Sequence, residues 1–178
     1  DLLSIRKNYI KSLKDLNVSE KIITDKMPVN FRMIGLILTA IPEAKIIHLT
    51  RNPKATCWSN YKHYFANENG FTFDQEDLAR FFILYQELMG FWHKSFPNKI
   101  HDISYERLTT HQEDETQKLL KYCELDWDNN CLNFHKNTRA VHTASASQVR
   151  QKMYQGSSDA WKKYEKFLQP LIMGLNQT

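Results

Sequence analysis

Motifs that mark several well-known enzyme classes are missing from this chain. Its five glycines are isolated. The sequence therefore contains neither the G-x-x-x-x-G-K-[ST] loop of P-loop NTPases nor the G-x-G-x-x-G turn of dinucleotide-binding enzymes. It also lacks the H-E-x-x-H pattern of zinc proteases and the G-x-S-x-G turn of esterases. ATPase, dinucleotide oxidoreductase, zinc protease and esterase functions therefore lose their usual sequence support.

Cysteine is scarce as well. The chain has three, Cys57, Cys123 and Cys131, and they are widely spaced. An odd number without a C-x-x-C or Cys/His zinc pattern indicates free thiols and no metal site. Free thiols favour a reducing compartment, and we expect the cytoplasm, although N-x-S/T sequons at Asn17 and Asn176 leave the compartment open.

Long apolar runs and strongly basic stretches are also missing. No run approaches the roughly 20 apolar residues of a membrane-spanning helix, so we expect no membrane partner. The net charge of +4 suits a small anionic ligand. Because no run of five or more basic residues accompanies that charge, the sequence does not indicate nucleic acid as a partner.

What the chain does contain is the composition of an ordinary globular protein. Its 178 residues are 42% hydrophobic and 25% charged. This length fits one domain, residues 1–178, with enough chain to bury a core. The first residue is Asp1 rather than Met, and we expect a fragment or a processed chain.

Hydrophobic spacing predicts alternating strands and helices. Helical spacing is found over residues 2–16, 29–40, 53–66, 74–95, 112–123 and 158–169, and Pro170 interrupts or ends the last of these helices. Short apolar runs favour strands at residues 21–24, 46–49 and 99–105. The aromatic stripe of residues 74–95 is expected to form core. Strands separated by helices indicate βαβ units, so the predicted fold class is α/β, a three-layer arrangement with a parallel sheet flanked by helices.

The most informative stretch covers residues 45–66. An apolar run of the kind found in buried strands ends at Arg51, and Asn52-Pro53 supplies a favoured N-cap followed by a favoured first helical residue. Arg51 is therefore expected at the carboxyl end of a strand and Ser59 about two turns into the next helix. An arginine beside a helix N-terminus is suited to a phosphate, but a strand-end arginine is about as often solvated or salt-bridged.

Other polar groups are expected at the same edge of the sheet. Lys26 and Tyr105 follow or end predicted strands, and the loop at 138–152 is rich in hydroxyls and cations. Taken alone, such a loop is more often a solvated connection. Together with three strand-end groups it favours a pocket for a multiply charged anion, because ligands of open α/β sheets bind at the carboxyl ends of the strands.

Four segments, in this order, resemble the sulfotransferases that use 3′-phosphoadenosine 5′-phosphosulfate (PAPS), in the group that includes tyrosylprotein and bacterial TPR-linked sulfotransferases. The segments are ITDKMPVNF at 23–31, AKIIHLTRNPKATCWS at 44–59, YERL at 105–108 and FHKNTRAVHTASASQVRQ at 134–151. The resemblance implies a P-loop NTPase-like sulfotransferase fold and transfer of a sulfuryl group from PAPS to an acceptor hydroxyl. It also implies that the product nucleotide, adenosine 3′,5′-bisphosphate (PAP), is a ligand.

The resemblance also implies roles for single residues. Arg51 and Ser59 match the pair that holds the 3′-phosphate of the cofactor, and Tyr105 matches a cofactor-contacting tyrosine. Arg150 lies in a segment that closes over the nucleotide.

Two further residues are implied in catalysis. Lys26 matches the lysine that contacts the sulfuryl group and its bridging oxygen, and Ser145 matches a serine near that group, with Ser147 an open alternative. Sulfuryl transfer needs alignment and charge neutralisation, which a lysine can supply without a metal.

One family element has no match. The family begins with a strand and a glycine/serine/threonine loop that holds the 5′-phosphosulfate, and its general base usually follows, so we name no base. We therefore expect the C-terminal two-thirds of a sulfotransferase domain, N-terminally truncated, and leave open whether this chain is active by itself. The alternatives are a non-catalytic 3′-phosphonucleotide-binding relative and a P-loop kinase-like protein. The acceptor cannot be inferred, and an exposed sheet edge would favour a homo-oligomer.

Overall fold

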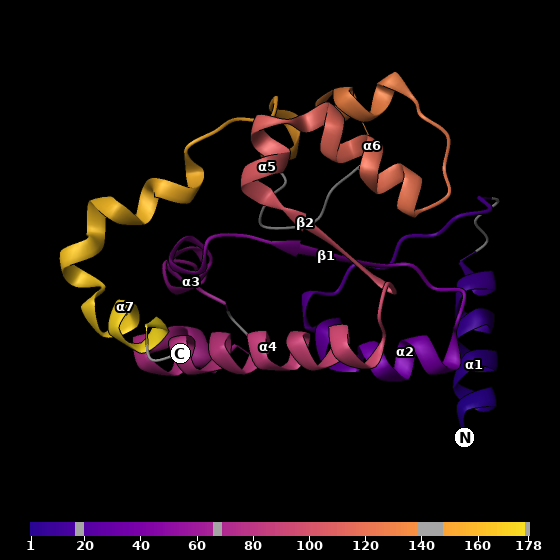
Figure 1. The fold of residues 1–178 in the computed structure, drawn as a ribbon, viewed down its shortest axis with the longest axis horizontal. Coiled ribbons are helices and arrows are strands. Elements are labelled where there is room, and N and C mark those ends of the chain that lie inside the picture. The colour runs from indigo at the N-terminus through magenta and orange to yellow at the C-terminus, as the bar shows by residue number, and fades with distance from the viewer. Residues whose placement is uncertain (17–19, 66–68, 139–147, 177–178) are drawn as a thin grey trace. The chain divides into compact units, whose positions relative to one another are not determined.

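The computed structural model describes residues 1–16, 20–65, 69–138 and 148–176. The chain divides into two compact units, whose helices and strands are labelled in Figure 1. The first unit contains residues 1–46 and 85–100, and the second contains residues 47–84 and 101–178. Whether these units form the single domain that the length predicts stays a prediction.

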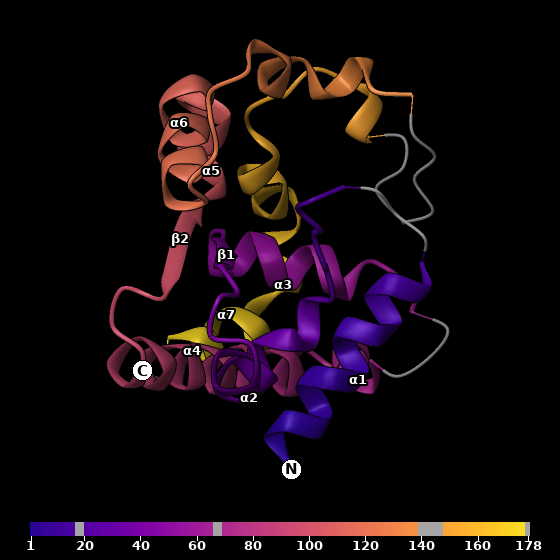
Figure 2. The same ribbon diagram turned by 90° about the vertical axis from the view of Figure 1, so that its right-hand side faces the viewer.

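The first unit is helical. It contains α1 (Leu2–Asp15), the 3₁₀ helix η1 (Pro28–Met33), α2 (Ile34–Ala40) and the second half of α4 (Gln75–Ser95). Figure 2 shows α1 lying beside α2. The Arg6 guanidinium of α1 forms an ion pair with Glu43 and donates to the Ala40 carbonyl oxygen at 3.3 Å, which ties α1 to the end of α2.

The core of the first unit joins α2, α4 and the start of the second strand. Its buried members are Ile34, Leu38, Met89 and Ile100. Trp92 packs against them and donates from its indole Nε1 to the Phe31 carbonyl oxygen at 2.8 Å, so its one polar group is satisfied. The apolar stripe of the long helix is thus core, as its spacing predicts.

The strand predicted at residues 21–24 is absent, and this prediction was wrong. Residues 22–27 have no regular secondary structure, and the side chains of Ile22 and Ile23 are 57% and 42% exposed. A strand needs a neighbour to satisfy its backbone and cover its side chains, and among the described residues none pairs with this segment. Here Asp25 accepts a hydrogen bond from the Tyr9 hydroxyl of α1 at 2.9 Å instead.

Among the described residues, the sheet that positions the candidate site has two parallel strands, β1 (Ile46–Thr50) and β2 (Ile100–Ser104). The sequence predicted three. Each strand runs directly into a helix, β1 into α3 (Pro53–Tyr61) and β2 into α5 (Tyr105–Thr110). β1 was expected to be buried, but Ile47 and Leu49 are 45% and 55% exposed because its burial alternates along the strand. Within the part of the chain that the structure describes, one face of β1 is therefore largely uncovered.

Helices make up the rest of the second unit. They are η2 (Gly70–Phe73), the first half of α4, α6 (Gln112–Tyr122), η3 (Asn129–Lys136), η4 (Gln148–Arg150), η5 (Ser157–Phe167) and α7 (Gln169–Leu175). α3 packs against η5 and α7, and the Trp58 and Tyr164 rings stack with centroids 4.5 Å apart. Leu78, Leu168 and Leu171 of this unit are almost completely buried.

Several predicted boundaries need correction. α3 ends at Tyr61 rather than near residue 66, and α5 and η3 were not predicted. The helix expected at 158–169 is a 3₁₀ helix, and Pro170 lies in the first turn of α7, where its missing N–H costs nothing. Among the described residues, no helix has the combination of length and apolarity that crossing a membrane requires.

Candidate functional site

The junction of β1 and α3 forms as its sequence predicts. Arg51 directly follows the last residue of β1, and the Asn52 side chain accepts from the backbone N–H of Ala55 at 3.0 Å. Pro53 occupies the first turn, where helices have spare N–H positions. These local signals fix the direction in which Arg51 leaves the strand.

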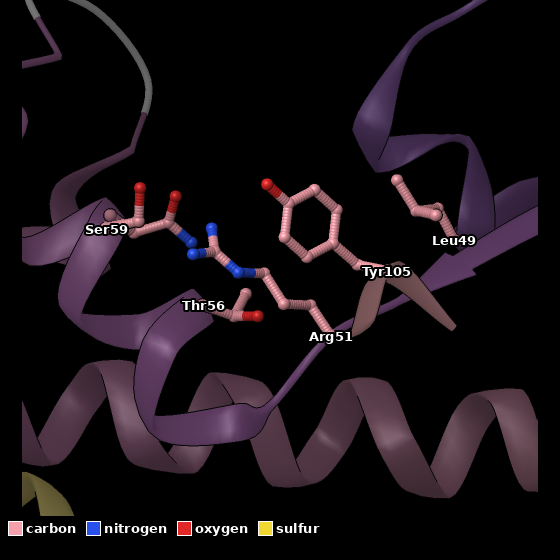
Figure 3. A pocket seen from close by; sticks show the side chains of 6 residues that line it. Leu49, Arg51, Thr56, Ser59 and Tyr105 are labelled. Carbon is pink, nitrogen blue, oxygen red and sulfur yellow. The ribbon is translucent and has the colours of Figure 1, made fainter. Parts of the chain in front are cut away.

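A hollow in the second unit lies beside this junction (Figure 3). The residues that line it are Leu49, Arg51, Thr56, Ser59, Asn60 and Tyr105. Arg51 and Tyr105 come together because each follows the carboxyl end of one of two neighbouring parallel strands. In Figure 3 the Arg51 side chain extends along α3 toward Ser59.

The Arg51 guanidinium is held in place by η5 and α5. Its Nε donates to Ser158 Oγ at 3.2 Å, and its Nη2 donates to the Ser157 carbonyl oxygen at 2.8 Å. Its Cζ lies 4.8 Å from the centre of the Tyr105 ring, a cation–π contact. The Tyr105 hydroxyl in turn forms a 2.9 Å hydrogen bond with Ser157 Oγ, so ring and serine are fixed together.

A carboxylate lies behind the serine pair. Glu106 Oε1 accepts from Ser158 Oγ at 2.6 Å and from the backbone N–H of Asn52 at 3.0 Å. Ser104 Oγ donates to Glu106 Oε2 at 3.3 Å. Burial, the largest single effect, favours the protonated acid, but these hydrogen bonds together lower the pKa of Glu106 below its ordinary value. Glu106 is therefore ionised at neutral pH.

The hollow has the donors that an anion needs. A guanidinium carries five N–H groups, and Arg51 uses two of them on Ser157 and Ser158. The other three make no hydrogen bond within the described residues, and Arg51 lines the hollow together with Ser59. Charge-assisted hydrogen bonds from a planar fork suit a terminal phosphate or sulfate group.

The other predicted site residues are Lys26, Ser145 and Arg150. Lys26 is exposed and belongs to the first unit, whereas the residues that line the hollow belong to the second. Ser145 and its alternative Ser147 lie outside the described residues. Arg150 ends η4, which packs against η3, and it does not line the hollow. The roles of all six predicted residues stay predictions.

Sequence reasoning missed the two serines that hold Arg51, Ser157 and Ser158, and the carboxylate of Glu106 behind them. Ser157 and Ser158 follow Gly156, whose φ of 87° lies in the left-handed region that glycine adopts easily, and this turn starts η5. Glu106 lies inside the YERL segment, next to Tyr105. Glu106 could have been found because it is a polar residue next to the predicted site residue Tyr105. No local signal connects residue 158 to residue 51.

Comparison with known proteins supports the resemblance of the segments at 23–31, 44–59 and 105–108 to sulfotransferases. The sequence profile of the Sulfotransferase family matches residues 3–129, which is more than half of the chain. The matched range includes β1, α3, β2 and α5, and so every residue that lines the hollow. The chain therefore belongs to the sulfotransferase family.

A longer relative is also similar to this chain. A protein of Aquifex aeolicus (strain VF5), described as an uncharacterized protein, is 39% identical over 174 residues. The similarity covers 96% of this chain and 23% of that protein. The chain thus spans about a quarter of the length of this relative, whose description states no activity.

Proposed function

We propose that this protein transfers a sulfuryl group from PAPS to an acceptor hydroxyl, and that the hollow between β1, α3 and α5 binds the 3′-phosphate of the nucleotide. The observation that carries the proposal is the state of Arg51: it is held by Ser157 and Ser158, yet keeps three N–H groups for a ligand beside the Ser59 hydroxyl. Membership of the sulfotransferase family supports the same interpretation.

The donor set fits the group that it would hold. A 3′-phosphate is a terminal dianion with three acceptor oxygens, and Arg51 offers a charged fork with a hydroxyl nearby. Tyr105 holds the guanidinium from one face and would contact the same nucleotide. PAPS, when bound, supplies the activated sulfuryl group, and the resemblance assigns contacts with that group to Lys26 and Ser145 and closure over the nucleotide to Arg150.

The proposal extends to the rest of the fold and its setting. We propose a three-layer, P-loop-like sulfotransferase arrangement of the tyrosylprotein and TPR-linked type, to which the two-stranded sheet belongs. Cys57 and Cys131 form no disulfide within the described residues, which supports a reducing compartment such as the cytoplasm. A small-molecule nucleotide is the proposed partner, without nucleic acid or membrane, and the uncovered face of β1 supports self-association.

Binding of PAP tests the phosphate site. Isothermal titration calorimetry compares PAP with AMP, which lacks the 3′-phosphate, on the wild-type protein and on Arg51→Ala. A hydrogen bond to a charged group contributes about 1.5–3 kcal/mol. We therefore expect the wild type to prefer PAP by about tenfold or more, and Arg51→Ala to bind both nucleotides equally.

Two further variants separate charge from geometry. Arg51→Lys keeps the charge and loses the planar fork, so we expect only part of the preference for PAP to remain. Arg80→Ala is the matched control, because it removes an equal charge from an exposed position on α4 of the same unit and should leave the preference unchanged. Equal affinities of the wild type for PAP and AMP would contradict the proposed phosphate site.

Chemistry needs its own measurement. Transfer of labelled sulfur from PAPS to a panel of phenols and alcohols, followed by chromatography, should give labelled products with the wild type and a loss of about tenfold or more with Lys26→Ala. Binding of PAP with no transfer to any acceptor would favour a non-catalytic nucleotide-binding relative.

A further inference from the structure

We propose that Glu106 is the positioning residue of the phosphate site and that it acts on Arg51 through the hydroxyl of Ser158. This inference rests on the proposed function for its ligand, but the arrangement of the three side chains is independent of it. Glu106 itself does not line the hollow, so its effect on a bound phosphate would pass through its neighbours.

The chain of hydrogen bonds has a defined direction. A serine hydroxyl has one hydrogen and two lone pairs. Because Ser158 donates that hydrogen to Glu106 Oε1 at 2.6 Å, its lone pairs remain for the Arg51 Nε–H, whose nitrogen lies 3.2 Å away. Without the carboxylate, the hydroxyl could rotate, and its preferred orientation toward Arg51 would be lost.

Glu106 is itself fixed from two other segments. The backbone N–H of Asn52, the residue after Arg51, donates to Oε1, and the Ser104 hydroxyl donates to Oε2. One carboxylate therefore joins the end of β2, the turn after β1 and the start of η5. These are the segments from which Tyr105, Arg51 and the serine pair project, so the carboxylate sets the geometry of the whole constellation.

The ionised state makes these bonds stronger. Carboxylate acceptors form shorter and stronger hydrogen bonds than neutral acceptors, which agrees with the 2.6 Å separation from Ser158. Hydrogen bonding outweighs burial in setting the pKa of Glu106, so the carboxylate keeps its charge at neutral pH.

The direct test follows the Arg51 Nε–H by ¹H–¹⁵N NMR, with the resonance assigned by its disappearance in Arg51→Lys. In the wild type we expect this proton to exchange slowly. Glu106→Ala and Ser158→Ala should speed its exchange about tenfold or more. Glu106→Gln and Ser158→Thr, which keep an acceptor and a hydroxyl, should restore protection to within about threefold. Glu113→Ala on the exposed side of α6 is the charge-matched control.

Nucleotide binding gives the second readout. Glu106→Ala and Ser158→Ala should reduce the preference for PAP over AMP about tenfold while leaving the affinity for AMP within about twofold. A purely structural loss would weaken both nucleotides alike. In an Arg51→Ala background, Glu106→Ala should have no further effect on the preference, because its target is gone.

The outcomes distinguish the positioning role of Glu106 from the proposed function of the site. Unchanged exchange of the Arg51 Nε–H in Glu106→Ala and Ser158→Ala would overturn the positioning role, whatever the nucleotides do. If Glu106→Ala fails to fold, Ser158→Ala decides, since it removes only one hydroxyl. Expected exchange behaviour in a protein that binds PAP and AMP equally would support the positioning role and contradict the proposed function.

Discussion

Among the polar side chains that line the hollow, Thr56 is the one from which we predict a change in stability. It lies on α3, and its hydroxyl oxygen is buried without a hydrogen-bond partner among the described residues. A buried hydroxyl left without a partner costs about 1–3 kcal/mol. Replacing Thr56 with valine keeps the shape, exchanges the hydroxyl for a methyl group and hardly changes helix propensity. We therefore expect Thr56→Val to stabilise the protein by about 1 kcal/mol, near the lower end because the residue is only half-buried.

Thr116→Val is the matched control. Thr116 is also half-buried in a helix, α6, but its hydroxyl donates to the Gln112 carbonyl oxygen at 2.6 Å. The same substitution there removes a hydrogen bond rather than an unpaired group, so we expect a loss of about 0.5–1.5 kcal/mol. The two variants should thus change stability in opposite directions.

Urea unfolding followed by circular dichroism measures both effects. The midpoint should rise for Thr56→Val and fall for Thr116→Val, with the m-value unchanged, because neither variant alters the surface exposed on unfolding. Affinity for PAP should stay within about twofold in Thr56→Val, since the hydroxyl oxygen is covered. A Thr56→Val protein that is no more stable than the wild type would refute the reasoning and show that the Thr56 hydroxyl is satisfied in solution.

Two further predictions concern the first unit. A Cβ at Gly35 would lie 2.6 Å from Trp92 Cζ3, so Gly35→Ala should cost about 1–3 kcal/mol in urea unfolding, whereas Gly90→Ala, with open space around it in α4, should gain about 0.5–1 kcal/mol. A destabilised Gly90→Ala would contradict this comparison. The hydrogen bond from Arg6 lowers the pKa of Glu43 from 4.5 to about 2. The stabilising contribution of the ionised Glu43 is therefore present above pH 4.5 and lost as the pH falls toward 2. The difference in unfolding free energy between wild type and Glu43→Gln should shrink over that interval. A constant difference across the interval would rule out the pair as its source.

The parts of the site that could be predicted are those whose signals are local. Asn52 and Pro53 define the start of α3 by their own chemistry, and this fixes Arg51 at the end of β1. The long helix α4 follows from the spacing of its apolar residues over many turns. In each case the residues that carry the information are neighbours in sequence, so no knowledge of tertiary structure is needed.

The parts that could not be predicted depend on distant contacts. Ser158 is 107 residues from Arg51, and nothing near either residue specifies that they meet. The apolar run at 21–24 has strand-like residues, yet a strand also requires a neighbouring strand, which local sequence cannot supply. For Glu106, the sequence shows its position beside the predicted site residue Tyr105. It does not show that Glu106 binds Ser158, which lies 52 residues away.

Arg51 uses two of its N–H groups on Ser157 and Ser158 and keeps three for a ligand, and this affects how strongly it could bind a phosphate. A free arginine side chain loses about 2 kcal/mol of rotamer entropy when a ligand orders it. Here Ser157, Ser158 and the Tyr105 ring order the side chain on folding, so a phosphate would meet a guanidinium that is already oriented. The holding contacts use uncharged acceptors, a carbonyl and a hydroxyl, which restrain the guanidinium without neutralising it. The negative charge of Glu106 reaches it only through Ser158, so the fork keeps its cationic character for the ligand.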